Sequence, residues 1–432
     1  MTRYAIIGAG PAGLATMRAM TKAGLEVDGY ESGADVGGLW DIENPRSSMY
    51  ESAHLISSRT TTEFTEFPMN SSVDYPGHRV LKKYFGDYAD AFGLRGRYAF
   101  HTTVTAVVRD PESDAWLLTA SGPTGEHTVA YDGVVLANGT LATPRIPSFP
   151  GEFTGELMHT SAYKHPDQLR GKRVLIIGAG NSGCDIAVDA VHHAASVEMS
   201  VRRGYYFVPR YLFGRPADTL NQGKPLPARV KQFIDKRVLR AFTGDPVRFG
   251  FPKPDYRIYE AHPIVNTLVL NHLGQGDLSI RGDVERFDGP RVHFRDGSSG
   301  EYDLVLLATG FELEYPFVDA AALNWTLAAP TLFLNIFPPT FNGLYVAGMI
   351  EASGIGWQGR YEQGELIATY LRAEKDAPEQ AAAFRERVRR ERWPDLTGGY
   401  HYLGLDRMSF YVNNHAYRTA VRAAITTLEG AR

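Results

Sequence analysis

The sequence predicts an α/β fold with two Rossmann-like dinucleotide-binding domains, one inserted into the other. Two glycine-rich loops of the same design carry this prediction: Gly8-Ala9-Gly10-Pro11-Ala12-Gly13 and Gly178-Ala179-Gly180-Asn181-Ser182-Gly183. Each loop follows a short aliphatic strand and precedes an apolar helical pattern, which is the context that a dinucleotide-binding glycine motif requires. In such a unit the first glycine makes the tight turn, the second admits the pyrophosphate and the third lets the helix pack on the strand.

The charges that follow the two loops distinguish their ligands. The first unit continues through a strand at 26–30 that ends at Glu31, and the second through a strand at 197–201 that ends at Arg202 and Arg203. An acid at this place accepts hydrogen bonds from a ribose 2′-hydroxyl, whereas arginine suits a 2′-phosphate through charge and forked donors. The first site is therefore predicted to bind FAD or NAD and the second NADP. The alternative is that these side chains are only solvated charges at the ends of strands. It is less favoured because the two strand ends are equivalently placed and oppositely charged.

Composition limits the classes of function. A length of 432 residues suggests two or three domains, and a net charge of −4 gives no basic field for nucleic acid. The single Cys184 excludes an internal disulfide and a CxxC dithiol, and it fits a reducing compartment. The longest apolar runs have strand length, and the first strand starts near residue 3. We therefore expect a soluble, cytoplasmic protein with no leader, no nucleic-acid or membrane partner and no metal site; a homodimer stays open.

The order of elements predicts the domain boundaries. Strands are expected at 101–109, 116–120 and 133–138, followed by a proline-rich linker at 144–150. After the second glycine unit, strands are expected at 278–280, 291–294, 303–309 and 344–347, and helices at 227–242, 358–374, 378–393 and 414–428. We predict that residues 1–150 and 305–432 form the FAD domain. Residues 151–304 would form the NADP domain, with an irregular, partly helical insertion at about 204–275. The only internal repeat visible in the sequence is the duplicated strand–helix–strand unit.

A fingerprint directly ahead of the second loop indicates the chemistry. Phe153, Gly155, His159 and Tyr163 match FxGxxxHxxx(F/Y). With the two glycine loops, Gly37-Gly38-Leu39-Trp40 and Ala308-Thr309-Gly310, this pattern resembles the flavin-containing monooxygenase family, a branch of the class B flavoprotein monooxygenases. Baeyer–Villiger relatives usually have Trp at the last aromatic position, so Tyr163 favours oxidation of a heteroatom.

The resemblance implies a monooxygenase that uses FAD and NADPH. Reduced FAD would add O2 as a C4a-hydroperoxide, and an amine nitrogen or a sulfide sulfur of a small-molecule substrate would take one oxygen atom. Such a site excludes water, and the protein positions the flavin rather than supplying its reactivity. Two alternatives stay open. One is Baeyer–Villiger oxygenation of a ketone, which a cation such as Arg59 near the flavin would favour. The other is an uncoupled NADPH oxidase or redox sensor.

The resemblance also assigns residues to the two cofactors. It adds Gly38, Leu39, Trp40, Gly348 and Gln358 to the FAD site, and Ala308 and Thr309 to the NADP site. The family's Asn beside the flavin is missing from the segment 50–60, so Ser57, Ser58 or His54 is the candidate donor there. We expect His159 to bind backbone at the junction of the domains rather than to act as an acid or base.

Overall fold

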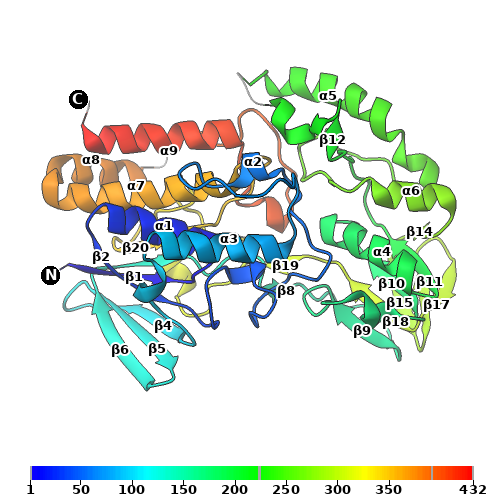
Figure 1. Cartoon of the computed structure of the whole chain (residues 1–432), viewed down its shortest axis with the longest axis horizontal. Coiled ribbons are helices and arrows are strands. Elements are labelled where there is room, and N and C mark those ends of the chain that lie inside the picture. Colours follow the sequence, from blue (N-terminus) through cyan, green and yellow to red (C-terminus); the bar gives the residue numbers. More distant parts are fainter. Residues whose placement is uncertain (1, 222–224, 391–392, 431–432) are drawn as a thin grey trace.

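Two parallel five-stranded sheets organise the protein, one in each half of the molecule (Figure 1). The computed structural model describes residues 2–221, 225–390 and 393–430. The first sheet has the order β20-β7-β1-β2-β3, and the second has the order β14-β11-β10-β18-β9. These ten strands are β1 (Arg3–Ile7), β2 (Glu26–Tyr30), β3 (Tyr98–Ala99), β7 (Gly133–Leu136), β20 (Leu344–Val346), β9 (Glu156–His159), β10 (Arg173–Ile177), β11 (Ser196–Ser200), β14 (Ser279–Arg281) and β18 (Leu304–Leu307). The arrangement confirms the predicted α/β fold.

The two halves repeat more than the strand–helix–strand unit that the sequence shows. Helices α1 (Pro11–Lys22) and α4 (Asn181–His193) follow the two glycine loops. A three-stranded antiparallel sheet precedes the fourth strand of each unit. These strands are β4 (Thr103–Arg109), β5 (Trp116–Gly122) and β6 (Gly125–Tyr131) in the first unit, and β15 (Val284–Asp288), β16 (Arg291–Phe294) and β17 (Ser299–Glu301) in the second. Each packs its apolar side on the neighbouring parallel sheet.

The outer strands β20 and β9 come from different places in the chain. In the first unit the strand beside β7 is β20, which lies more than 200 residues downstream, whereas the equivalent strand β9 precedes the second glycine loop. The fingerprint therefore contributes an edge strand to the second sheet, with His159 at its carboxyl end. Because ligands lie at the carboxyl ends of parallel strands, His159 faces the side of the sheet that would carry the dinucleotide.

The chain passes from the first unit to the second and back again, and these two connections, which we call the first and second crossings, lie side by side. β8 (Thr143–Pro144) pairs with β19 (Phe311–Glu312), and the Arg145 N–H donates to the Gly310 carbonyl at 3.0 Å. β18 pairs in parallel register with β10, Leu304 opposite Val174, so residues 304–307 belong to the second sheet. The predicted domain boundary at residue 305 is therefore a few residues too early. The strand β18 is still hydrogen-bonded to β10, so the chain returns to the first unit only after residue 307.

Helices cover the first sheet, and an irregular segment lies above the second. α7 (Gly356–Asp376) packs on α1, and α8 (Pro378–Arg389) and α9 (Asn414–Glu429) pack on α7. α3 (His78–Ala91) and the short α2 (Arg59–Thr62) precede the first crossing. The segment 204–275 contains β12 (Tyr211–Leu212), β13 (Arg215–Pro216), η4 (Ala217–Asn221), α5 (Ala228–Thr243), η5 (Pro246–Phe249) and α6 (Leu268–Gln275).

Candidate functional site

The first glycine loop forms a cradle closed by Glu31. Gly8 has φ +106°, and a Cβ at Gly13 would lie 1.8 Å from the Gly8 carbonyl oxygen, so only glycine permits this contact of helix and strand. The buried Glu31 carboxylate accepts the backbone N–H groups of Ala9 and Gly33, each at 2.7 Å. The amino end of α1 adds free N–H groups and a partial positive charge beside the loop. The predicted residues Gly8, Gly10, Pro11, Ala12, Gly13 and Glu31 thus lie together and fit the adenosine and pyrophosphate of FAD.

The segment Gly38–Trp40 lies against this cradle. The Gly37 N–H donates to the Ala9 carbonyl at 3.0 Å, and a Cβ at Gly38 would lie 2.8 Å from the Gly10 Cα. Leu39 and Trp40 continue this contact as a single 3-10 turn, with both side chains half-buried. The backbones approach too closely for any larger residue, which fixes the wall of the cradle.

Gly348 and Gln358, the two residues predicted near the start of α7, are both hydrogen-bonded within the protein. The Gly348 N–H donates to Gln363 Oε1 at 2.9 Å, and Gln358 Oε1 accepts the Thr65 N–H at 2.9 Å. Gln358 thus ties α7 to the 64–69 loop. Trp357 packs among aromatic rings of the core, 4.5 Å from Phe85 between ring centroids. The fully buried Gln363 was missed, because a glutamine inside a helix carries no sequence signal for a contact with a strand end.

The second glycine loop differs from the first in its open middle position. Gly178 has φ +107° and a Cβ at Gly183 would lie 2.4 Å from the Gly178 oxygen, but a Cβ at Gly180 would meet nothing within 4 Å. Asn181 is engaged elsewhere, since its Oδ1 accepts the Val265 N–H at 2.8 Å. Ser182 is half-buried on the first turn of α4. The loop therefore keeps space where a pyrophosphate approaches.

The carboxyl edge of the second sheet supplies the remaining predicted NADP residues. Arg202 is exposed and Arg203 half-buried just beyond β11. Among the residues that the structure describes, neither takes part in an ion pair, so both guanidinium groups are available to a phosphate. Ala308 packs against the glycine loop, its oxygen 2.5 Å from the place of a Gly178 Cβ. The Thr309 hydroxyl instead donates to the Arg145 carbonyl at 2.5 Å, between the two crossings.

His159 joins the fingerprint to the second crossing. Its Nε2 lies 3.0 Å from the Gly310 carbonyl oxygen and its Nδ1 accepts the Ser161 N–H at 3.1 Å, which assigns the proton to Nε2. Burial lowers the pKa of His159 below its ordinary value. A neutral imidazole that donates to backbone holds the crossing in place, as we expected from the sequence.

The other fingerprint residues pack inside the second unit. The Phe153 ring lies 5.5 Å from that of Phe287. A Cβ at Gly155 would lie 2.8 Å from the Asp303 oxygen, so glycine allows β9 to approach β18. Tyr163 is fully buried, and its hydroxyl donates to Asp189 Oδ2 at 2.9 Å.

Two carboxylates on α4 bind the first unit to the second. The Ser52 hydroxyl donates to Asp189 Oδ2 at 2.5 Å, and the Tyr50 hydroxyl donates to Asp185 Oδ2 at 3.2 Å. Burial raises the pKa of Asp185, against the opposing effect of its hydrogen bonds from Asn266 and Tyr50. We call Tyr50, Ser52, Asp185 and Asp189 the domain clamp. No pattern in the sequence predicts the domain clamp, because its two halves lie about 135 residues apart.

The three candidate donors are not equivalent. Ser58 is buried, and both its N–H and its hydroxyl donate to Asp218 Oδ2, at 2.7 and 3.0 Å. His54 is exposed, with Nδ1 2.6 Å from the Ser52 oxygen. Ser57 is half-buried. Asp218, from η4, was not predicted; it also accepts the Thr61 hydroxyl at 2.5 Å and so connects the 204–275 insertion to this segment.

Arg59 is already engaged within the first unit. Its Nη1 lies 3.7 Å from Glu63 Oε2 and donates to the Met69 carbonyl at 3.3 Å. The charge of Arg59 is thus partly neutralised by a carboxylate one helical turn away.

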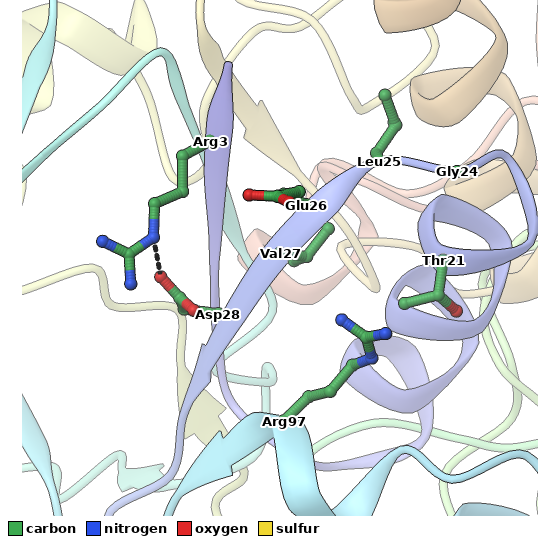
Figure 2. Close-up of a pocket in the computed structure, with 8 residues that line it drawn as sticks. All are labelled: Arg3, Thr21, Gly24, Leu25, Glu26, Val27, Asp28 and Arg97. Atoms are coloured by element: carbon green, nitrogen blue, oxygen red, sulfur yellow. Dashed lines mark ion pairs between the residues drawn. The ribbon is translucent and has the colours of Figure 1, made fainter. Parts of the chain in front are cut away.

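A cavity of about 570 Å³ lies at the wrong end of the first sheet to hold a dinucleotide (Figure 2). Arg3 on β1 and both Glu26 and Asp28 on β2 line the cavity. Thr21 on α1 and Arg97, which directly precedes β3, also line it. Arg3 Nε lies 2.6 Å from Asp28 Oδ2. The cavity opens at the amino ends of the strands, whereas ligands of such sheets bind at the carboxyl ends.

The described residues lack two kinds of feature that would bear on function. They contain no group of three or more His, Cys, Asp or Glu side chains that fits a metal ion. Nor do they contain a helix with the length and apolar character needed to cross a bilayer.

Comparisons with known proteins agree with this geometry. Flavin-containing monooxygenase 5 of Oryctolagus cuniculus is 32% identical over 379 residues, covering 82% of this chain and 70% of the relative. The S-allyl-L-cysteine S-oxygenase of Allium sativum superposes with a TM-score of 0.68 at 20% identity, covering 98% of this chain and 88% of that one. A steroid monooxygenase bound to NADP superposes with a TM-score of 0.72 at 18% identity, covering 98% and 97%. At these identities the two structures show the shared fold.

The family assignment rests on the match along the sequence. Residues 1–408 match the family described as flavin-binding monooxygenase-like. The matched range contains both glycine loops, the fingerprint and both crossings. The chain therefore belongs to the flavin-binding monooxygenase-like family, as an oxygen-inserting enzyme that uses FAD and NADPH.

Proposed function

We propose that this enzyme transfers one oxygen atom from O2 to a nucleophilic nitrogen or sulfur centre of a small molecule. The observation that carries the proposal is the pair of cradles of opposite charge, Glu31 at one and Arg202 with Arg203 at the other. The fingerprint residue His159 binds the Gly310 carbonyl beside the second of these cradles. We further propose that FAD occupies the loop 8–13 and NADPH the loop 178–183. A cytoplasmic location and the absence of a nucleic-acid partner stay predictions from Cys184 and the net charge of −4.

The residues of the chain bind, orient and shield. When bound, FAD supplies electron transfer from NADPH and the activation of O2. Glu31 holds the first loop in the shape that accepts a ribose and pyrophosphate, and Gly38 closes its wall. Thr309 ties the two crossings to each other and His159 ties the second crossing to β9, so these residues would help to orient the two units that hold the cofactors.

Heteroatom oxygenation is favoured over Baeyer–Villiger oxygenation by two observations. Tyr163 occupies the last aromatic position of the fingerprint. Arg59, the cation that would stabilise a nucleophilic, anionic oxidant, is engaged with Glu63 and with the Met69 carbonyl. An electrophilic oxidant that reacts with a soft nucleophile needs no such cation.

An uncoupled NADPH oxidase is the second candidate, and one observation favours it. Ser58 donates to Asp218, and His54 is exposed. Of the three candidates, Ser57 alone keeps a half-buried hydroxyl with no hydrogen bond to another described residue. A single weak donor would protect activated oxygen less well against loss as hydrogen peroxide.

Product and peroxide, measured together, separate the candidates. The FAD-loaded enzyme would be mixed with NADPH and O2 and with matched amines, thioethers and ketones. We expect an N- or S-oxide in proportion to the NADPH consumed, and little lactone or ester from ketones. Peroxide equal to the NADPH consumed for every compound would instead establish the oxidase, and ester formation alone would establish Baeyer–Villiger activity.

A further inference from the structure

Arg407 belongs to the first unit but lies against the second. It is part of the 3-10 turn η7 (Asp406–Met408), which precedes α9. Tyr411, in the same segment, forms an isolated bridge with Glu351, a few residues beyond β20 of the first sheet. The Tyr411 hydroxyl lies 3.2 Å from Nδ1 of His262, which belongs to the insertion of the second unit. The segment that contains η7 is therefore held between the two units.

The insertion residues beside His262 rest on the second glycine loop. Asn181 Nδ2 donates to the Pro263 carbonyl at 3.3 Å, and Asn181 Oδ1 accepts the Val265 N–H at 2.8 Å. His262 directly precedes this pair of contacts, so η7 lies next to the loop 178–183. This loop is the proposed position of the NADPH pyrophosphate, which places η7 beside the coenzyme.

Three arginines lie near the hydroxyl of Tyr205, which follows β11. Burial raises the pKa of Tyr205, and three guanidinium charges act to lower it, those of Arg407, Arg202 and Arg203. Arg202 and Arg203 come from the second unit, whereas Arg407 reaches this place from the first. The Tyr205 hydroxyl has no hydrogen-bond partner among the residues that the structure describes. One free hydroxyl and three cations thus meet where the two units face each other.

The charge of Arg407 is only loosely compensated. Its Nη2 lies 3.6 Å from Glu351 Oε2, which is longer than a hydrogen bond, and its side chain is 50% exposed. Within the described ranges, Arg407 has no other carboxylate partner and donates no side-chain hydrogen bond. Like charges held close together repel, so a bound anion stabilises this arrangement. A dinucleotide suits it, because its phosphates accept charge-assisted, forked hydrogen bonds from guanidinium groups.

We propose that Arg407 binds the pyrophosphate of NADPH from the first unit, with the Tyr205 hydroxyl as a second donor. The inference rests on the proposed binding of NADPH at the loop 178–183. Arg202 and Arg203 stand at the strand end that faces the 2′-phosphate, whereas Arg407 lies by the glycine loop. Because NADPH and NADH share the pyrophosphate, Arg407 governs the affinity for both coenzymes, and Arg202 governs the choice between them. The coenzyme site is then complete only when the two units are together.

Titration of the full-length, FAD-loaded enzyme with NADP⁺ and NAD⁺ tests the proposal, since the oxidised coenzymes bind without turnover. Arg407→Gln should raise the Kd for both about ten-fold, as expected for loss of a charge-assisted hydrogen bond, and should make binding less sensitive to salt. Arg407→Lys should restore part of the affinity. Arg372→Gln is the matched control, because Arg372 is 56% exposed and pairs with one carboxylate, Asp376, at 3.1 Å. It should bind both coenzymes like the wild type, and circular dichroism and FAD content should stay unchanged in every variant.

Glu351→Gln separates coenzyme binding from a structural role of the ion pair. If Arg407 binds phosphate, removal of its competing carboxylate should lower the Kd for NADP⁺ about two- to three-fold, the effect of one exposed ion pair. An equal loss of affinity in Glu351→Gln and Arg407→Gln would overturn the proposal, because the pair would then only hold η7 in place. An unchanged Kd in Arg407→Gln, with NADP⁺ binding by Arg202→Ala impaired, would overturn it too and leave the proposed NADPH site standing. If neither arginine variant changes the Kd, the coenzyme does not bind at the loop 178–183, and the proposed function loses its second cradle.

Discussion

Arg202 is the side chain on which the preference for NADPH over NADH is expected to depend. It is exposed just beyond β11, where the 2′-phosphate of a nucleotide held by the loop 178–183 would lie. Arg202→Ala should raise the KM for NADPH about ten- to hundred-fold, as expected for loss of a charge-assisted hydrogen bond worth about 1.5–3 kcal/mol. The KM for NADH should change little. Steady-state kinetics with both coenzymes checks this, with Arg286→Ala on β15 as a control for the loss of one surface arginine. An equal change for both coenzymes would contradict the assignment.

His262 is expected to make the stability of the protein depend on acid pH. It lies 3.2 Å from the Tyr411 hydroxyl, and burial lowers its pKa to about 4, with Glu351 acting to raise it and Arg407 to lower it. Between pH 6.5 and 4 the unfolded chain therefore binds a proton that the folded chain does not. The free energy of unfolding should fall in this window as the pH is lowered, by about 3 kcal/mol for this group.

The substitution His262→Phe isolates this effect because it keeps an aromatic ring against Tyr411. Urea unfolding at pH 7.5 and pH 4.5 should show a smaller loss of stability for the variant than for the wild type. Carboxyl groups titrate in the same range in both proteins, so their contribution cancels in the comparison. If the two proteins lose the same free energy, the burial of a neutral His262 is wrong.

Residues with local partners could be predicted, and those with distant partners could not. Glu31 follows the first glycine loop within about 25 residues, and the structure brings the two together. Asp218 accepts a hydrogen bond from Ser58, 160 positions away in the sequence. Gln363 accepts one from Gly348, just beyond the end of β20, and no sequence pattern links these two residues. No periodicity in one sequence reports such pairs, since they depend on how whole elements pack.

At the scale of elements, two glycines of the second loop are expected to have different roles, Gly183 in folding and Gly180 in coenzyme binding. A Cβ at Gly183 would lie 2.4 Å from the Gly178 oxygen, whereas a Cβ at Gly180 would meet nothing within 4 Å. Gly183→Ala should therefore lower stability by about 1–3 kcal/mol through overpacking. Gly180→Ala should fold normally and keep FAD, but lose NADPH binding because the methyl group occupies the approach of the pyrophosphate.

Thermal unfolding and NADPH titration of the same variants distinguish the two effects. Gly96→Ala is the neutral control, since its Cβ also meets nothing and its φ is not positive. Normal NADPH binding by Gly180→Ala would show that the coenzyme does not use this loop.

Element prediction succeeded where the pattern is decided locally. The strand at 291–294 and the helix starting at 378 are as predicted, because apolar alternation and a proline at the first helical position mark them. The strand β6 was missed, because its side chains are mostly exposed and polar. Trp357, which precedes the predicted flavin contact Gln358, packs in the core against Phe85. A large aromatic residue in a glycine-rich turn does not itself reveal whether it packs in the core or lines a ligand site.

At the scale of the whole molecule, the sequence showed that one unit is inserted in the other but not how the two are held. The crossings are paired by β8 and β19, and β9 joins the second sheet from upstream. The domain clamp adds a second attachment: Tyr50 and Ser52 come from the first unit, and Asp185 and Asp189 from α4. These carboxylates are one helical turn apart, so they present two acceptors to one loop.

The domain clamp is expected to restrain the loop around Tyr50. Tyr50→Phe/Ser52→Ala removes two donors, while Asn266 still serves Asp185 and Tyr163 still serves Asp189. Hydrogen bonds to charged groups contribute about 1.5–3 kcal/mol each, so the loop around Tyr50 should open more often. Amide hydrogen exchange in residues 47–53 should rise about ten-fold or more. A larger fraction of the NADPH consumed should appear as peroxide, because the units no longer hold the two cofactors at a fixed distance. Thr105→Val/Thr119→Val removes two hydroxyls from β4 and β5 and should change neither quantity. If exchange at 47–53 stays that of the wild type, the clamp does not set the relative position of the two units, and the paired crossings alone hold it.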